Sequence, residues 1–282
     1  MRTTALAPGA SPIAKRPAAT AATVAGIGAA PALGGLCWAV FAWQIRSAKR
    51  APRPYIDALD ADGLVGTAGQ PGQRPLRVVW LGDSLAAGLG VDAVEDTPAR
   101  LVSRMLERSI DLTVLAKPGA TSGDVLEQQV PALAAIGADL VVLCVGANDV
   151  ARLSSRSGYA LRLDEIVSAT APIPTVVLSL PDMAMPDRMA QPLRSIAGMR
   201  ARWFEAARAR VVARHEHATS VDVASRPAAV TRRAGRNMLC ADRFHPGPEA
   251  YRIWAERIAD TCHRLLTQGT GEPAVEGLFL GP

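Results

Sequence analysis

The chain has 282 residues, 49% of them apolar and 20% charged, so it can bury a core of ordinary size and is not disordered throughout. Its formal charge is +5, but residues 1–45 carry three basic side chains and no acidic one, which leaves only +2 for residues 46–282. That near balance, an aromatic content of 4% and the lack of a recognisable binding motif argue against a nucleic-acid-binding protein.

The first predicted element is an apolar segment near the N-terminus. The 29 residues before Arg46 contain no charged side chain, and Val24–Ile45 is long enough to cross a bilayer core as a helix. Basic residues begin at Arg46, which is typical of the end of a membrane span. We therefore predict a basic arm over residues 1–17 and a membrane anchor or signal segment over residues 18–45, and we expect a single-pass protein of the cell membrane.

Two other interpretations of this segment stay open. Residues 40–42 (Val-Phe-Ala) offer small side chains at plausible signal-peptidase positions, so the alternative is secretion after cleavage. Pro31 and the pair Gly34–Gly35 weaken any helix, so the segment could also be a loose arm. Residues 46–75 are rich in Pro, Gly and Asp without a sustained period, and they are predicted to be a linker.

From Leu76 onward, short apolar runs alternate with longer helical patterns. Strands are expected at residues 77–81, 112–115, 139–145, 175–180 and 219–223. Helices are expected at residues 97–108, 122–135, 158–171, 194–215 and 248–266. This alternation predicts an α/β protein in which helices cover both faces of a mainly parallel sheet, a three-layer α/β/α sandwich. The domain is predicted to span residues 76–268, followed by a flexible tail over residues 269–282.

Polar residues follow several of these strands, where parallel sheets bind their ligands. The segments are Gly-Asp-Ser-Leu (82–85), the loop around Gly119, Gly-Ala-Asn-Asp (146–149) and Asp-Arg-Phe-His (242–245). Taken singly, Ser84 could cap a helix, Gly119 could serve only a turn, and Asn148 could bond its own backbone. Asp242 stands three residues before His245 and can accept from one imidazole nitrogen, which leaves the other free as a base. Their joint occurrence, in this order and at strand ends, is a strong signal for one site.

The four segments resemble the motif blocks of the SGNH, or GDSL, family of serine esterases and lipases, and the resemblance spans about residues 77–266. It implies the SGNH-hydrolase fold, a flavodoxin-like, five-stranded sheet in the order 2-1-3-4-5, here preceded by an N-terminal apolar helix. It also implies that Ser84 is the nucleophile and that His245 is the base, oriented by Asp242. We therefore expect a carboxylic ester hydrolase of the esterase or lipase type that works through an acyl-enzyme.

The same resemblance implies an oxyanion hole made of the Ser84 and Gly119 backbone N–H groups and the Asn148 side chain, and it implies no metal and no cofactor. One departure is Lys117–Pro118 before the glycine, which we interpret as loop variation. The motifs do not distinguish a general esterase from an O-acetyl esterase or a thioesterase. A non-catalytic binding module with this fold at the membrane is a further alternative, although the intact Ser84 and His245 argue against it.

The surroundings of the predicted site are less determined. Asp83 and Asp149 neighbour the site and could line the substrate pocket, although hydrogen bonds that shape their turns are the default expectation. Met183 and Met185, in the loop after the fourth strand, could give an acyl chain a soft apolar lining or could pack against the domain. The partner is thus expected to be a small-molecule, lipid or carbohydrate ester.

His245 is set apart from the other three histidines because an aspartate precedes it by three residues. His215 and His217 stand at a predicted helix end, where capping is the simplest role, and His263 lies inside the last helix. The four cysteines are too far apart for a CxxC metal site, and a Cys240–Cys262 disulfide stays open.

Overall fold

The computed structural model describes residues 58–66, 73–184, 190–224 and 238–270. The predicted basic arm and apolar segment lie outside the described residues, as do residues 271–282 of the predicted tail. Among the helices that the structure does describe, none combines the length and the apolar character needed to cross a bilayer.

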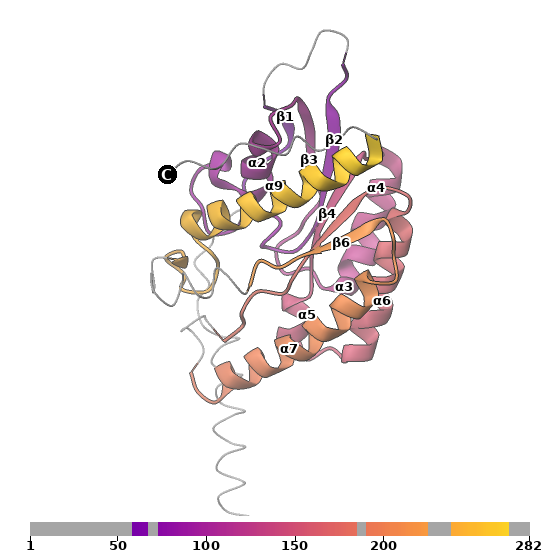
Figure 1. Cartoon of the computed structure of the whole chain (residues 1–282). Helices are drawn as coiled ribbons and strands as arrows, with labels where there is room; N and C mark the ends of the chain where they lie inside the picture. The colour runs from indigo at the N-terminus through magenta and orange to yellow at the C-terminus, as the bar shows by residue number, and fades with distance from the viewer. Residues whose placement is uncertain (1–57, 67–72, 185–189, 225–237, 271–282) are drawn as a thin grey trace, which may run out of the picture. The chain divides into compact units, whose positions relative to one another are not determined.

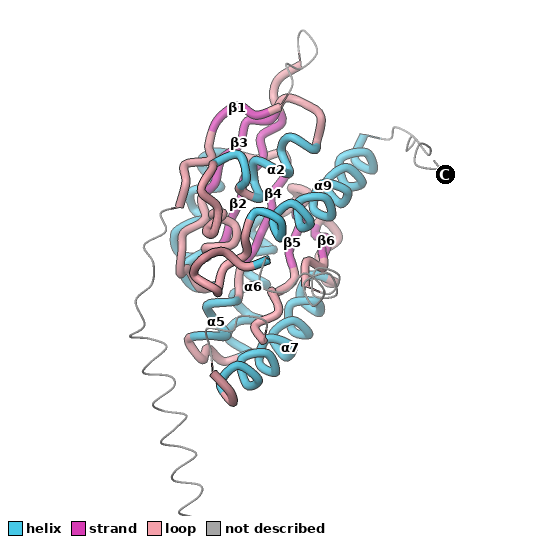
Figure 2. The backbone as a smooth tube through the Cα atoms, turned by 90° about the vertical axis from the view of Figure 1, so that its left-hand side faces the viewer, coloured by secondary structure: helices cyan, strands magenta, loops and turns pink. Residues whose placement is uncertain are grey.

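Within the described residues, six strands form one sheet in the order β1-β3-β2-β4-β5-β6 (Figures 1 and 2). Five of them are parallel, and these are β2 (Leu76–Gly82), β3 (Ile110–Val114), β4 (Leu140–Cys144), β5 (Thr175–Leu178) and β6 (Ala218–Val221). Counted along the chain, these five strands follow the order 2-1-3-4-5, so the predicted order of the parallel strands is confirmed.

The sixth strand, β1 (Gly63–Val65), corrects the prediction of a five-stranded sheet. It pairs antiparallel with β3, and it lies within residues 46–75, which the sequence predicts to be a linker. Asp62 fixes β1 there, because its side chain accepts from the Val114 N–H (2.7 Å) and its carbonyl accepts from Arg100 (2.6 Å). Three residues are too short a run to stand out in a Pro- and Gly-rich stretch, yet they find unpaired backbone groups at the open edge of β3.

Helices cover both faces of the sheet (Figures 1 and 2). One face carries the short 3₁₀ helix η1 (Val94–Asp96), α2 (Pro98–Met105) and α9 (Pro248–Thr270). The other carries α3 (Ser122–Asp124), the π-helical turn η2 (Val125–Gln129), α4 (Val130–Ile136), α5 (Ala147–Ala151), α6 (Arg156–Thr170) and α7 (Leu193–Val212). Val78 and Trp80 of β2 point into the core under α2 and α9, whereas Val79 and Leu81 point into the opposite core. This alternation is the strand period of two, and it confirms the three-layer sandwich.

The central position of β2 decides where a site can form. β2 pairs with β3 on one side, where Trp80 faces Val114, and with β4 on the other, where Gly82 faces Cys144. The strand order therefore reverses at β2, and open α/β sheets bind ligands outside the carboxyl ends of the strands at such a switch point. Ser84 follows the last residue of β2 by two positions, so the fold places it at this crevice.

Candidate active site

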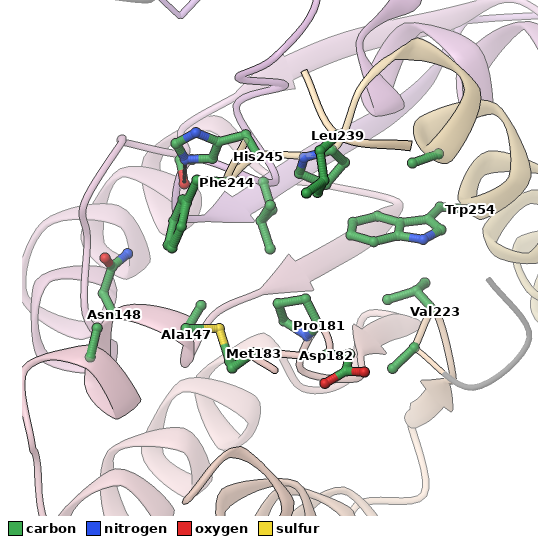
Figure 3. A pocket seen from close by; sticks show the side chains of 16 residues that line it. Ala147, Asn148, Pro181, Asp182, Met183, Val223, Leu239, Phe244, His245 and Trp254 are labelled. Atoms are coloured by element: carbon green, nitrogen blue, oxygen red, sulfur yellow. Dashed lines mark hydrogen bonds between the residues drawn. The ribbon is translucent and has the colours of Figure 1, made fainter. Parts of the chain in front are cut away.

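A pocket opens at the carboxyl ends of the strands and is shown with its 16 lining side chains in Figure 3. Its polar side chains belong to Ser84, Asn148, Asp182 and His245, and the remaining lining residues are apolar. Figure 3 shows Asn148 at one end of the pocket and Trp254 at the other. The pocket therefore has a polar end suited to chemistry and a long apolar wall suited to an organic group.

Ser84, His245 and Asp242 form one continuous line of hydrogen bonds. The Ser84 Oγ lies 3.1 Å from His245 Nε2, although the two residues are 161 positions apart in the chain. His245 Nδ1 lies 2.6 Å from Asp242 Oδ2. The structure thus brings together the three residues that the sequence predicts to be catalytic, in the geometry that activates a serine hydroxyl.

Ser84 is held in place by the rigid end of β2. Gly82 has φ +141°, and a Cβ at this position would lie 2.0 Å from the Cys144 carbonyl oxygen, so only glycine fits. The Gln129 side chain bonds the same residue twice, accepting from the Gly82 N–H (2.7 Å) and donating to the Gly82 carbonyl (2.9 Å). Gln129 comes from η2, and sequence analysis missed it, because a glutamine inside a helical pattern carries no local sign of a bond to a strand 47 residues away.

Asp83 is not among the residues that line the pocket, and its hydrogen bonds lie within its own turn and to Asn148, in keeping with the default expectation from the sequence. Its side chain is only 1% exposed, and it accepts from the Leu85 N–H (3.0 Å) and, at 3.4 Å, from the Asn148 amide. Burial raises the pKa of Asp83 to about 7, against the lowering effects of the Leu85 N–H and of His245. Asp83 is therefore a buried carboxyl group, next to Ser84 in the chain and in contact with Asn148, whose pKa lies near neutral pH.

Asp149 is likewise not among the residues that line the pocket. It is fully buried, and its two carboxylate oxygens accept from the Ser122 N–H (2.8 Å) and the Ser122 hydroxyl (2.7 Å), while Arg162 lies 3.4 Å away. These bonds join the start of α3 to α5, as expected of a residue that shapes its turn. Met183 does line the pocket, whereas Met185 lies outside the described residues.

The predicted oxyanion donors lie in three neighbouring segments. Within the described part of the chain, the backbone N–H groups of Ser84 and Gly119 donate to no protein acceptor. Gly119 has φ +83°, and its carbonyl is held by Arg152 at 2.8 Å. The Asn148 amide nitrogen donates one hydrogen bond to the Ala120 carbonyl at 3.0 Å, and its second contact, to Asp83, is long at 3.4 Å. The Ser84 and Gly119 N–H groups and one N–H of the Asn148 amide are thus free or weakly engaged, as an anion site requires, and of these residues Ser84 and Asn148 line the pocket whereas Gly119 is not among its lining residues.

We name residues 238–247 the histidine loop, and it is organised around Asp242. Oδ1 of Asp242 accepts from the Phe244 N–H (2.8 Å), the His245 N–H (2.9 Å) and the Cys240 thiol (3.0 Å). Burial alone would raise the pKa of Asp242, but the bonds from the His245 ring, the Cys240 thiol and the two N–H groups outweigh it and hold the pKa well below its ordinary value. The carboxylate is therefore ionised at neutral pH and can only accept hydrogen bonds.

The histidine loop packs against the serine turn, the name used here for residues 82–90. A Cβ on Gly90 would lie 2.1 Å from the Pro246 carbonyl oxygen, so the two backbones touch at that point. The Tyr251 hydroxyl, from α9, donates to the Leu89 carbonyl at 2.7 Å. Cys240 and Cys262 are both free cysteines, so the disulfide left open by the sequence is absent from this region.

The other histidines lie outside the pocket, but one of them differs from expectation. His215 has an aspartate partner, Asp164 of α6, at 2.8 Å, a pairing hidden from the sequence because the residues are 51 positions apart. His217 bonds the Val167 carbonyl, and His263 bonds the Met105 carbonyl. In the described ranges, no three histidine, cysteine or acidic side chains converge as a metal site would require.

Comparison with known proteins gives one family match. Residues 80–253, more than half of the chain, match the GDSL-like lipase/acylhydrolase family. No curated protein matches the chain in sequence.

Several solved structures share the fold. A lipase/acylhydrolase from Enterococcus faecalis is 20% identical (TM-score 0.55), and the match covers 69% of this chain and 96% of that one. The psychrotrophic esterase EstA from Pseudoalteromonas sp. is 19% identical (TM-score 0.53; 68% and 98% covered). An acetyl xylan esterase from Geobacillus stearothermophilus is 18% identical (TM-score 0.52; 70% and 95% covered). Identities this low show the fold alone. The match of residues 80–253 to the family shows more: the chain belongs to the GDSL-like lipase/acylhydrolase family.

Proposed function

We propose that this protein is a serine hydrolase that cleaves carboxylic esters through an acyl-enzyme on Ser84. The observation that carries the proposal is the line of hydrogen bonds from the Ser84 hydroxyl to the His245 ring (3.1 Å) and from that ring to Asp242 (2.6 Å). Ser84 and His245 face a pocket that also holds Asn148. Nucleophile, base and a candidate oxyanion donor are therefore within reach of one bound ester.

In the acylation step, His245 Nε2 accepts the hydroxyl proton while Ser84 Oγ attacks the ester carbonyl carbon. The bond to the leaving alcohol oxygen then breaks, and the imidazolium gives its proton to that oxygen. Deacylation repeats these steps with water as the nucleophile. His245 Nε2 takes a proton from the water while the water oxygen attacks the acyl carbon. Ser84 Oγ then leaves and regains a proton from the imidazolium. One ester and one water thus give one carboxylic acid and one alcohol.

Asp242 holds the imidazole in the form that this exchange needs. Because an ionised carboxylate only accepts, His245 Nδ1 carries the ring proton, and Nε2 of the neutral ring presents a lone pair to Ser84. When Nε2 takes the hydroxyl proton, the nearby negative charge stabilises the imidazolium.

The tetrahedral intermediate places a negative charge on the former carbonyl oxygen. We assign its stabilisation to the Ser84 N–H, the Gly119 N–H and the Asn148 amide, of which the first two donate to no acceptor within the described residues. Asn148 can exchange its 3.4 Å contact with Asp83 for a bond to the oxyanion at little cost, because a contact of that length is weak. Loss of one such donor typically costs about 2.7–4 kcal/mol of transition-state stabilisation.

The pocket favours esters with an apolar acyl group. Apart from Asp182, its lining beyond the reacting residues is apolar, and the lining runs past Met183 to Trp254 (Figure 3). The carboxylate of Asp182 disfavours substrates that carry a negative charge at that point. O-acetyl esters and thioesters undergo the same chemistry, so a substrate panel must include them.

The decisive experiment is ester turnover by the full-length protein in detergent, with para-nitrophenyl acetate, butyrate and octanoate, an acetylated xylan and a butyryl thioester. Ser84→Ala should lower turnover at least about 10³-fold, because nucleophile and base act as a unit. Ser103→Ala is the matched control, since Ser103 is a buried serine of α2 whose hydroxyl finds no hydrogen-bond partner among the described residues. Equal turnover by Ser84→Ala and the wild type would contradict the proposal.

A fluorophosphonate probe separates the enzyme from a non-catalytic binding module with the same fold. The probe reacts only with an activated serine, so we expect a covalent adduct on Ser84 in the folded protein and none after denaturation. A folded protein that stays unlabelled would favour the binding module.

We further propose that residues 18–45 attach the enzyme to the membrane. Support comes from their sequence alone, which lacks charged side chains and is followed by Arg46. Full-length protein should stay in the membrane fraction after carbonate washing, and a chain that begins at residue 46 should not. Release of the full-length protein by carbonate would exclude a spanning helix.

A further inference from the structure

Cys240 contacts the aspartate of the proposed triad directly. Its Sγ lies 3.0 Å from Asp242 Oδ1, the oxygen that also accepts the backbone N–H groups of Phe244 and His245. The other oxygen, Oδ2, receives the His245 ring at 2.6 Å. The Asp242 side chain is only 4% exposed, so these protein groups take the place of water around the carboxylate.

The thiol is the donor in this contact. Burial and then the hydrogen bond to Asp242 raise the pKa of Cys240 to about 11, so Sγ keeps its proton at neutral pH. Cys240 is a free cysteine, and its backbone is fixed as well, because its N–H donates to the His245 carbonyl at 2.9 Å. A protonated, anchored thiol beside an ionised carboxylate donates its S–H to it.

We propose that Cys240 is a positioning residue of the triad. Its S–H supplies the third hydrogen bond to Asp242 Oδ1, which keeps Oδ2 turned towards the His245 ring and lowers the negative charge available there. The inference rests on the proposed function, because only a catalytic pair of Asp242 and His245 gives the contact a kinetic consequence.

Loss of the S–H has a defined chemical effect. With one donor fewer, more negative charge stays on the carboxylate, so Oδ2 binds the Nδ1 proton more strongly and the protonated ring is favoured. More of the enzyme then lacks a free Nε2 at low pH, and the acid limb of the kcat/KM profile moves to higher pH. Asp83 also acts on His245 through space, but it lies outside the histidine loop and is unchanged by a substitution at Cys240.

The test compares Cys240→Ala, Cys240→Ser and Cys262→Ala in the full-length protein with para-nitrophenyl butyrate. Cys240→Ala should lower kcat/KM about two- to ten-fold at neutral pH and shift the acid limb upward, as expected for one lost hydrogen bond. Cys240→Ser keeps a donor, and Cys262→Ala removes a buried thiol of α9, so both should keep the wild-type limb. An equal loss in both Cys240 variants with an unmoved limb would show a packing role and overturn the proposal.

Proton NMR supplies a measurement that needs no turnover. The Nδ1 proton shared by His245 and Asp242 should resonate far downfield, and Cys240→Ala should move it further downfield while Cys240→Ser leaves it in place. An unmoved resonance in Cys240→Ala overturns the positioning role, whether or not the protein hydrolyses esters. A moved resonance in a protein without esterase activity supports the contact and overturns the proposed function instead.

Discussion

The serine turn and the histidine loop meet at the candidate site, but they are held in different ways. The serine turn continues the central strand, where Gln129 bonds both backbone groups of Gly82 and the Asp83 N–H donates to the Cys144 carbonyl at 3.1 Å. The histidine loop has one β-bridge, Leu239 to Pro246, and one turn in which the Arg243 N–H donates to the Cys240 carbonyl, and its remaining bonds converge on Asp242. One half of the site is therefore set by the sheet and the other half by its own carboxylate.

The difference between the two regions has a direct effect on the charge of their aspartates. Both lie in low-dielectric surroundings, which raise the pKa of a carboxyl group. Asp83 has one good donor, the Leu85 N–H, and its pKa rises to about 7. Asp242 has four donors, and its pKa falls well below the ordinary value. Deeper burial with few donors keeps the pKa of Asp83 high, whereas four donors outweigh the lesser burial of Asp242 and fix its negative charge beside His245.

The largest expected effect comes from removing that fixed charge. Asp242→Asn should lower kcat on the order of 10³–10⁴-fold, because an amide no longer holds the His245 tautomer that presents a free Nε2. Asp164→Asn is the matched control, since Asp164 also bonds a histidine, His215, at 2.8 Å but lies away from the pocket. Steady-state kinetics at neutral pH measure kcat for both variants. If Asp242→Asn lowers kcat less than tenfold, the orientation of His245 does not depend on the Asp242 carboxylate.

On the other side of the site, Asn148→Ala should lower kcat about 10²–10³-fold with KM within a few-fold, because an oxyanion donor acts mainly in the transition state. The measurement is kcat and KM for para-nitrophenyl butyrate, with the melting temperature as a check on folding. A raised KM at unchanged kcat would instead assign Asn148 to ground-state binding.

Asp83→Asn sharpens the comparison of the two carboxyl groups. Because the folded pKa of about 7 lies above the unfolded value, the folded state holds a proton that the unfolded state releases. The free energy of unfolding of the wild type should therefore fall as pH rises from about 4 to 7, by up to about 4 kcal/mol, and Asp83→Asn should remove this fall. Asp242 has the opposite sign and loses its contribution only at acidic pH, below this window.

Urea unfolding at pH 5 and pH 8 measures this effect. The wild type should lose stability between the two conditions, and Asp83→Asn should lose much less. Asp92→Asn, at an exposed carboxyl group outside the pocket, should behave as the wild type. Parallel losses in the wild type and Asp83→Asn would show that Asp83 stays ionised throughout.

The parts of the site that sequence predicts are those with a local pattern. Short apolar runs between helical patterns predict the five parallel strands. Asp242 stands three residues before His245, and this short spacing predicts the contact of 2.6 Å between the Asp242 carboxylate and the His245 ring. Gln129 has no such pattern, because its bonds to Gly82 depend on where η2 packs against β2.

Adjacency in sequence also misleads where the chain turns. Asp83 and Asp149 stand next to Ser84 and Asn148, yet successive side chains point in different directions, so the aspartates are buried beneath the site while their neighbours line it. Which of two neighbouring polar residues faces a pocket is set by backbone geometry, and composition does not record it.

The contact between the two regions is tested by Gly90→Ala, which should have the smallest effect. Gly90 has φ +111° and Gly63 has φ +109°, so an alanine at either position carries a similar backbone strain of about 1–3 kcal/mol. Among the described residues, the atom nearest to a Cβ at Gly63 is 3.9 Å away, whereas a Cβ at Gly90 would lie 2.1 Å from the Pro246 carbonyl oxygen.

Gly90→Ala must therefore push the histidine loop from the serine turn, and a displacement of a fraction of an ångström should lower kcat/KM about tenfold. Gly63→Ala, far along the sheet in β1, should lose stability but keep its kcat/KM. If both variants lose activity alike, backbone strain alone accounts for the loss. If only Gly90→Ala loses activity, the distance between Ser84 and His245 depends on the contact between the serine turn and the histidine loop. We expect the histidine loop to be the part that moves, because it has fewer bonds to the sheet.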